Sequence, residues 1–285
     1  MDLIVYLLIV AASVAQSAFT KAFNRQSRHS AVFNAVKAGT ALILFALMAA
    51  PGFAFHWPTL LFGLMYGGGL CLSMYAGYRA LCLGPMALTS MLVSFSVAIP
   101  LAWGVTVGQE TLSFVKCAAL VLLLCAIVLT NADKLRHGQK KQENQGLWLL
   151  FVGLTLLCNG VCSILQKQHQ TLYPEAYSRE FMFFAMLLCA VIFAFAALKK
   201  LPLREIKAVK GKRYGVLSGV TNGMANFLTL ILAGFENASI LFPVISAGTI
   251  LGALLCGRFV FKEKLKINHY AALAAGIAAV VLLKL

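Results

Sequence analysis

Acidic side chains are scarce in this chain, which has 9 Asp and Glu against 24 Lys and Arg and a net charge of +15 at pH 7. None of the acids falls near the middle of a long apolar run. A carboxylate at that depth is the usual group through which a transporter exchanges protons for cationic drugs. Its absence argues against that mechanism.

Charge of either sign is also sparse, because only 12% of the residues are charged and 61% are hydrophobic. A chain of 285 residues with a mean hydropathy of +0.86 has too much apolar surface for a soluble core and is typical of a membrane protein. Lipid permits only helices or closed barrels, and the long unbroken apolar runs favour helices. We therefore predict an all-α, polytopic membrane protein.

Catalytic and metal-binding patterns are missing as well. The five histidines are scattered near expected loops or helix ends, and neither G-x-S-x-G nor H-E-x-x-H occurs. The 8 cysteines have no metal-ligand or secreted-scaffold spacing, which indicates packing residues. We expect no enzyme activity, no metal and no cofactor.

Long apolar runs are what the chain does contain. Ten segments are near the length of about 20 residues that crosses a bilayer: 3–22, 31–50, 58–80, 85–107, 112–132, 146–166, 178–198, 213–235, 238–260 and 266–284. The first has no basic residues before it, so we expect a span and not a cleaved signal. The long polar break at 133–145 is the expected cytoplasmic linker between two halves, 1–132 and 146–285.

The two halves carry matching sequence. In the first half L-x-x-G-x-x-V-x-x-E-x-L runs from Leu101 to Leu112, and it returns from Leu254 to Leu265 after a constant shift of 153 positions. In both copies the glutamate, Glu110 or Glu263, lies in a tight turn between two apolar segments. The pattern predicts a duplication of five helices. Because five is odd, the second half enters the membrane inverted.

The basic residues predict the orientation. Most follow the odd-numbered segments: Lys21, Arg25, Arg28, Arg79, Lys134, Arg136, Lys140, Lys141, Lys199, Lys200, Arg204, Lys207, Lys210, Lys212, Arg213, Arg258, Lys262, Lys264 and Lys266. The connections on the other side have only Lys116, Lys167 and Arg179. The positive-inside rule makes the first group cytoplasmic and both termini non-cytoplasmic. These charges indicate topology signals and lipid contacts, not nucleic-acid binding.

Polar side chains form stripes on three of the segments. The first has Ser13, Gln16, Ser17 and Thr20 on one helical face, the sixth has Asn159, Ser163, Gln166 and Lys167, and the eighth has Asn222, Asn226 and Thr229. Two interpretations are open. The stripes join helices by hydrogen bonds, or they line a wet substrate cavity where the repeats meet.

Lys37 is the one cation well inside a segment, about 10 Å along it at 1.5 Å per residue. It either extends back to the cytoplasmic surface or faces the cavity and attracts an anionic group. Tyr75 and Tyr78 are further candidates for contact with substrate, although aromatic residues mostly serve packing and interface belts. The run Gly67 to Gly69 favours close helix packing or bending.

Ten segments in two halves with this repeated signature resemble the EamA-type drug/metabolite transporter superfamily over essentially the whole chain. The resemblance implies an alternating-access carrier whose central cavity lies between segments 1 to 4 and 6 to 9, with segments 5 and 10 peripheral. Members carry substrates from amino acids to lipid-linked sugars, so it names no substrate. They are often drawn with cytoplasmic termini, whereas the charges here predict the opposite.

The working hypothesis is a secondary transporter of a small polar metabolite, an amino acid or similar zwitterionic or anionic solute, in a bacterial inner or plasma membrane. Its candidate substrate-binding residues are Gln16, Ser17, Lys37, Tyr75, Tyr78, Asn159, Ser163, Asn222 and Asn226. Its expected partners are the substrate and membrane lipids, as a monomer or homodimer. The alternatives are a broad drug exporter, a flippase for lipid-linked sugars, a channel or a membrane scaffold.

Overall fold

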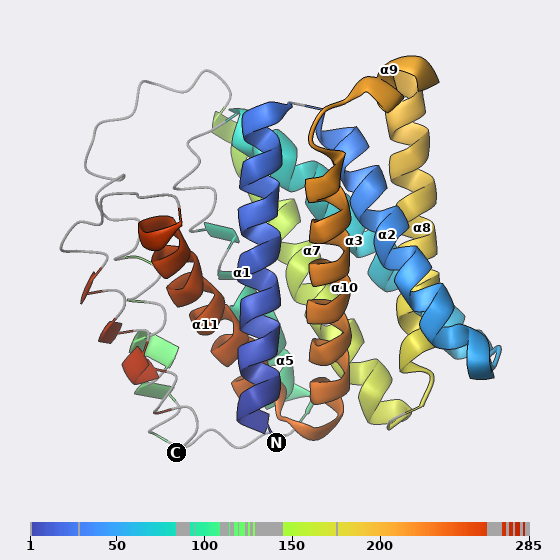
Figure 1. The fold of residues 1–285 in the computed structure, drawn as a ribbon. Helices are drawn as coiled ribbons and strands as arrows, with labels where there is room; N and C mark the ends of the chain where they lie inside the picture. Colours follow the sequence, from blue (N-terminus) through green and yellow to red (C-terminus); the bar gives the residue numbers. More distant parts are fainter. Residues whose placement is uncertain are drawn as a thin grey trace. The chain divides into compact units, whose positions relative to one another are not determined.

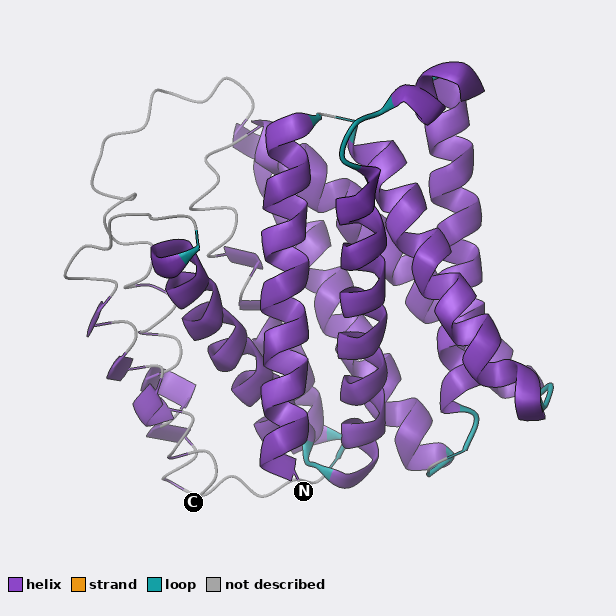
Figure 2. Ribbon diagram, viewed as in Figure 1, coloured by secondary structure: helices purple, strands orange, loops and turns teal. Residues whose placement is uncertain are grey.

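The computed structural model describes residues 2–27, 29–83, 92–93, 95–108, 145–174 and 176–260, with scattered residues between 114 and 128 and between 270 and 282. All regular structure in these ranges is helical (Figure 1, Figure 2). The elements are α1 (Asp2–Gln26), α2 (Ser30–Ala49), η1 (Ala50–Gly52), α3 (Trp57–Leu83), η2 (Phe95–Val97), α5 (Ala98–Thr106), α7 (Gln145–Leu172), α8 (Ser178–Lys200), α9 (Leu203–Ala208), α10 (Lys212–Phe235) and α11 (Ala238–Phe259). The all-α prediction is confirmed for this part of the chain.

Six of these helices, α1, α2, α3, α7, α8 and α10, are long and apolar enough to cross a membrane. Each coincides with a segment predicted from the sequence. Shorter apolar helices over 95–106 and 238–252 fall in the fourth and ninth segments. The fifth and tenth segments, the turns with Glu110 and Glu263, and the linker lie mostly outside the described residues.

The helix ends follow from local chemistry. Pro51 lies two residues after the end of α2, and Pro58 occupies the first turn of α3, where a missing N–H breaks no helical bond. Helix α8 has Glu180 in its first turn and Lys199 and Lys200 in its last, which complements the helix dipole. Gly211, between α9 and α10, has a φ of +83°, a conformation that favours glycine.

The helices form two compact units. Unit 1 comprises Met1–Cys71 and Leu165–Phe235, and unit 2 comprises Leu72–Ile164 and Glu236–Leu285. The boundaries therefore fall inside α3, inside α7 and between α10 and α11.

Unit 1 is held together by close helix contacts at glycines. Helix α10 packs against α1 and α2, and α2 packs against α8 (Figure 1). Gly215, Gly219 and Gly223 recur every four residues on α10, and a Cβ added at Gly219 would lie 2.5 Å from the carbonyl oxygen of Lys37. This small-xxx-small arrangement lets membrane helices approach closely.

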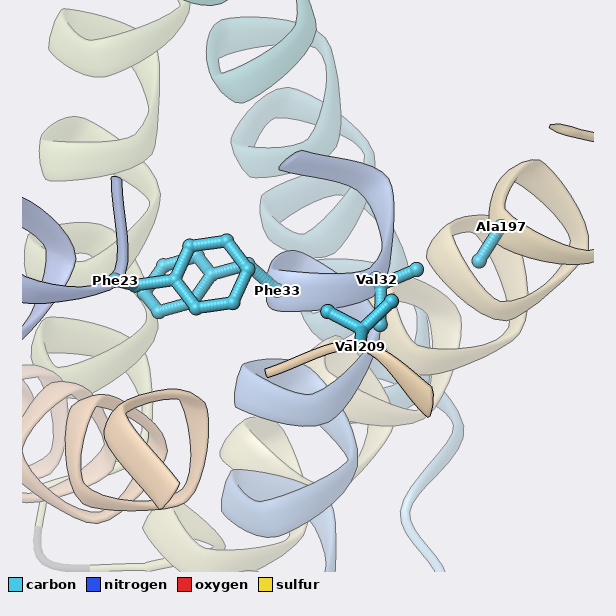
Figure 3. Close-up of a cluster of buried hydrophobic side chains, with 5 residues drawn as sticks. All are labelled: Phe23, Val32, Phe33, Ala197 and Val209. Atoms are coloured by element: carbon cyan, nitrogen blue, oxygen red, sulfur yellow. The ribbon is translucent and has the colours of Figure 1, made fainter. Parts of the chain in front are cut away.

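An apolar cluster closes one end of unit 1 (Figure 3). Phe23 of α1 and Phe33 of α2 face each other with ring centroids 4.7 Å apart. Val32, Ala197 and Val209 complete the cluster, so it joins α1, α2, α8 and the turn after α9. Burial of these side chains fixes the turn that carries the chain from α8 to α10.

Unit 2 is built on α5, α11, the start of α7 and the end of α3. Helix α11 packs against α5. A Cβ added at Gly160 of α7 would lie 2.5 Å from Cβ of Ile99, so α7 and α5 approach closely. Ala80, Trp148 and Val152 form a buried cluster between α3 and α7.

Candidate functional site

A polar stripe runs along α10 beside its glycines. Ser218, Asn222 and Asn226 recur every four residues, so they share one side of the helix. Ser218 is fully buried, Asn222 is 6% exposed, and Asn226 is half-buried. Buried hydroxyl and amide groups in an apolar setting need hydrogen-bond partners, and the three residues differ in whether they have them.

The Asn226 amide belongs to a complete network. Tyr66 Oη donates to Asn226 Oδ1 at 2.8 Å, and Asn226 Nδ2 donates to the carbonyl oxygen of Asn222 at 2.8 Å. Gln166 Nε2 lies 3.3 Å from the carbonyl oxygen of Asn226 and 3.4 Å from Tyr66 Oη. The network fastens α3, α7 and α10 together, which is the interhelical role predicted as one alternative for such stripes.

Three polar side chains nearby have no such partners. Ser218 Oγ is buried without a hydrogen bond. Lys37 is 8% exposed, and neither its ammonium nor the Asn222 side-chain amide hydrogen-bonds to any residue that the structure describes. The contact between Gly219 and the Lys37 backbone brings α2 against the stretch of α10 between Ser218 and Asn222. Unit 1 therefore contains a cation, a hydroxyl and an amide with unmet hydrogen-bonding capacity.

The candidates on α1 lie in the same unit but are less buried. Ser17 is exposed and donates to the carbonyl oxygen of Ser13 at 3.0 Å, while Thr20 donates to that of Gln16 at 2.8 Å. Both hydroxyl groups are thus satisfied by their own helix, as serine and threonine commonly are. The Gln16 side chain is half-buried.

The remaining candidates belong to unit 2. Ser73 Oγ donates to Asn159 Oδ1 at 2.6 Å, and Ser163 Oγ donates to the carbonyl oxygen of Asn159 at 3.2 Å. Tyr75 is 54% exposed and meets the Phe151 ring edge-on at 6.4 Å. The side chain of Tyr78 lies outside the described part of the chain.

A pocket of about 530 Å³ opens in unit 1 where α2 ends and α8 begins. The polar residues that line it are Gln170, Tyr177, Ser178, Arg179 and Glu180, and the others are Gly52 and, from α10, Phe227, Ile231 and Phe235. This volume is in the range of small-molecule sites. A lining that contains both polar and apolar side chains suits a metabolite with a charged end and a hydrocarbon part.

The cysteines in the described ranges form no disulfide. The cysteines that the structure describes, Cys71, Cys117, Cys125, Cys158, Cys162, Cys189 and Cys256, are free. Cys71 and Cys189 lie with their sulfur atoms 3.3 Å apart as hydrogen-bonded thiols. Over the described ranges, no three His, Cys, Asp or Glu side chains are grouped so that they could hold a metal ion.

Comparison with known proteins gives a fold but no family. No family model matches the chain, and no curated protein sequence matches it. A solved crystal structure of a protein superposes with a TM-score of 0.80 at 15% identity, covering 98% of this chain and 94% of the other. At this identity the likeness concerns the fold alone.

Proposed function

We propose that the protein is a secondary transporter that carries a small zwitterionic or anionic metabolite, an amino acid in the first instance, across a bacterial inner or plasma membrane by alternating access. The observation that carries the proposal is the burial of a cation and of two uncharged polar side chains inside unit 1. Lys37, Ser218 and Asn222 lie on apolar helices, where an unmet hydrogen bond or charge is costly. A substrate carboxylate would give the Lys37 ammonium an anionic partner.

The proposed architecture is ten helices in two inverted five-helix repeats, 1–132 and 146–285, with non-cytoplasmic termini. It is supported by the repeated signature, by the basic residues after odd-numbered segments and by the six helices long enough to span a bilayer. The resemblance to EamA-type transporters supports the same reading. Substrate would meet Lys37 as one repeat rocks against the other.

Asn222 and Asn226 form a matched pair for testing the binding site. The assay is a thermal-shift screen with single amino acids. A ligand that binds the folded state adds about 2.7 kcal/mol to the free energy of unfolding at 100 times its Kd, and the melting temperature therefore rises. Asn222→Ala is expected to abolish that shift with little change in the unliganded protein. Asn226→Ala is expected to lower the unliganded melting temperature, since a membrane interhelical hydrogen bond contributes about 0.6 kcal/mol, and to keep the shift.

The activity itself is tested by counterflow of labelled amino acids in proteoliposomes at equal pH on both sides. We expect saturable exchange for at least one zwitterionic or anionic compound. No saturable exchange across amino acids and related organic anions would contradict the proposal. Export of hydrophobic drugs alone would support the broad drug exporter instead, and a retained thermal shift in Asn222→Ala would remove this residue from the site.

A further inference from the structure

The pocket in unit 1 opens where α10 ceases to lie against α2. The last of the α10 glycines that contact α2 is Gly223, and at the same spacing of four the row continues with Phe227, Ile231 and Phe235. Rows at this spacing are the ridges through which helices pack, so large side chains there hold the helices apart. The rings of Phe45 and Phe227 meet with centroids 5.8 Å apart, and α2 leans away from α10 toward its C-terminal end (Figure 1). The three large side chains of α10 line the resulting pocket.

Glu180 brings a buried carboxylate to the lining of this pocket. It is 6% exposed, and its Oε1 accepts one hydrogen bond, from the backbone N–H of Ala54 at 3.3 Å. No basic side chain that the structure describes forms an ion pair with it. Arg179, its neighbour in the chain, donates instead to the carbonyl oxygen of Met48 at 3.3 Å. The first turn of α8 favours a negative charge, but a buried carboxylate with no cation beside it can still bind one.

Gln170 brings a second acceptor to the same lining, and its amide is held in place. Its Nε2 donates to Ser178 Oγ at 2.9 Å and lies 3.1 Å from His169 Nδ1, so both amide hydrogens are used. His169 is itself joined to His56 through Thr59, whose Oγ1 lies 3.1 Å from His169 Nε2 and 2.9 Å from His56 Nδ1. Gln170 is 1% exposed, and its Oε1 accepts no hydrogen bond from the residues that the structure describes. The carbonyl oxygen is therefore left for a donor in the pocket.

We propose that this pocket is a second binding site, separate from Lys37, for a small molecule that joins a primary ammonium group to a hydrocarbon body. An ammonium group has a positive charge and three N–H donors, which match the Glu180 carboxylate and the Gln170 carbonyl oxygen. The large side chains of α10 offer apolar surface to the hydrocarbon body, and aromatic rings also attract a cation. Lys37 is not among the lining residues, so this site does not depend on the proposed transport function.

Two sources supply this chemistry. Free amines and apolar amino acids carry a primary ammonium group, and so does the ethanolamine headgroup of a membrane lipid. The volume of about 530 Å³ is that of a small-molecule site and favours the free amine.

The first test needs no variant. The probe is 3-methylbutan-1-amine, which has the ammonium group and the hydrocarbon body but lacks the carboxylate through which a substrate would meet Lys37. We expect it to raise the melting temperature of the purified protein in detergent at constant pH, because a ligand that binds the folded state stabilises it. The alcohol of the same shape, 3-methylbutan-1-ol, is expected to give no such shift. Equal shifts for the two compounds, or none for the amine, overturn the proposal.

Glu180→Gln tests the residue that carries the recognition. Glutamine keeps an oxygen for the Ala54 N–H and removes the charge, so the variant should fold and bind the amine about ten- to hundredfold more weakly. Glu205→Gln is the matched control, since Glu205 also lies in the first turn of a helix, α9, but is exposed and outside the lining. Undiminished amine binding in Glu180→Gln overturns the assignment.

Phosphatidylethanolamine in mixed micelles is the probe for the second source. A thermal shift with this lipid and none with 3-methylbutan-1-amine assigns the pocket to a lipid headgroup and overturns the free-amine site. The outcome is also independent of transport. Counterflow without an amine shift overturns the pocket site and leaves the carrier intact, whereas an amine shift without any counterflow supports the pocket site and contradicts the carrier.

Discussion

Gly67→Ala is expected to destabilise the protein, whereas Gly68→Ala, the same change one residue later, is expected to be neutral or slightly stabilising. A Cβ at Gly67 would lie 2.6 Å from the carbonyl oxygen of Ala185 on α8, with the Ala185 Cα and carbonyl carbon at 3.1 and 3.2 Å. All three are backbone atoms, which cannot rotate away. The Cβ at Gly68 would meet only the flexible tip of Leu188 at 4.0 Å.

The two substitutions are expected to change the free energy of unfolding by different amounts. Forcing a methyl group into a closely packed contact costs typically about 1–3 kcal/mol, and α3 must move away from α8 to relieve it. Alanine is favoured over glycine in a helix by about 1 kcal/mol, and at Gly68 nothing opposes that gain. Thermal unfolding of both variants in detergent, followed by circular dichroism, measures the difference. Equal melting temperatures would show that α3 and α8 do not pack as described.

Close packing at Gly67 is one of the two roles that the sequence left open for its glycine run, because adjacent glycines in an apolar segment favour close helix contacts or bending. The six long helices were likewise predictable, since hydrophobic length reports directly on a membrane span. The glycine stripe on α10 was equally visible as Gly215, Gly219 and Gly223 at a spacing of four. That this stripe packs against α2 could not be predicted, because periodicity shows which face of a helix carries the glycines but not which helix contacts that face.

The same limit applies to the polar residues. The spacing of Asn222 and Asn226 predicted a shared face, but only the positions of Tyr66 and Gln166 show that Asn226 is satisfied. Ser218 continues this stripe four residues before Asn222 and could have been found by the same periodicity. In contrast, His56 and His169 are 113 positions apart by their numbers, and no local pattern indicates that Thr59 joins them.

Lys37→Met is expected to reduce transport of carboxylate substrates and, at the same time, to raise the melting temperature of the unliganded protein. A hydrogen bond to a charged group contributes about 1.5–3 kcal/mol, so losing the ammonium should lower transport efficiency by about ten- to hundredfold. The free energy of unfolding of the unliganded protein should rise. A lysine at the centre of a spanning helix costs about 2.5–3.5 kcal/mol on the insertion scale, and methionine removes the part of that cost that Lys37 bears.

Opposite changes in activity and stability distinguish a binding cation from a structural one. Lys167 is the matched control, because its Nζ donates to the carbonyl oxygen of Ala233 at 3.0 Å and so fastens α7 to α10. Lys167→Met should lower the melting temperature and leave the affinity for substrate unchanged in the folded fraction. If Lys37→Met lowers stability and transport together, Lys37 has a structural role and does not bind substrate. A Lys37→Met protein that is more stable and yet fails to exchange carboxylates would show that the buried charge serves substrate binding at a cost in stability.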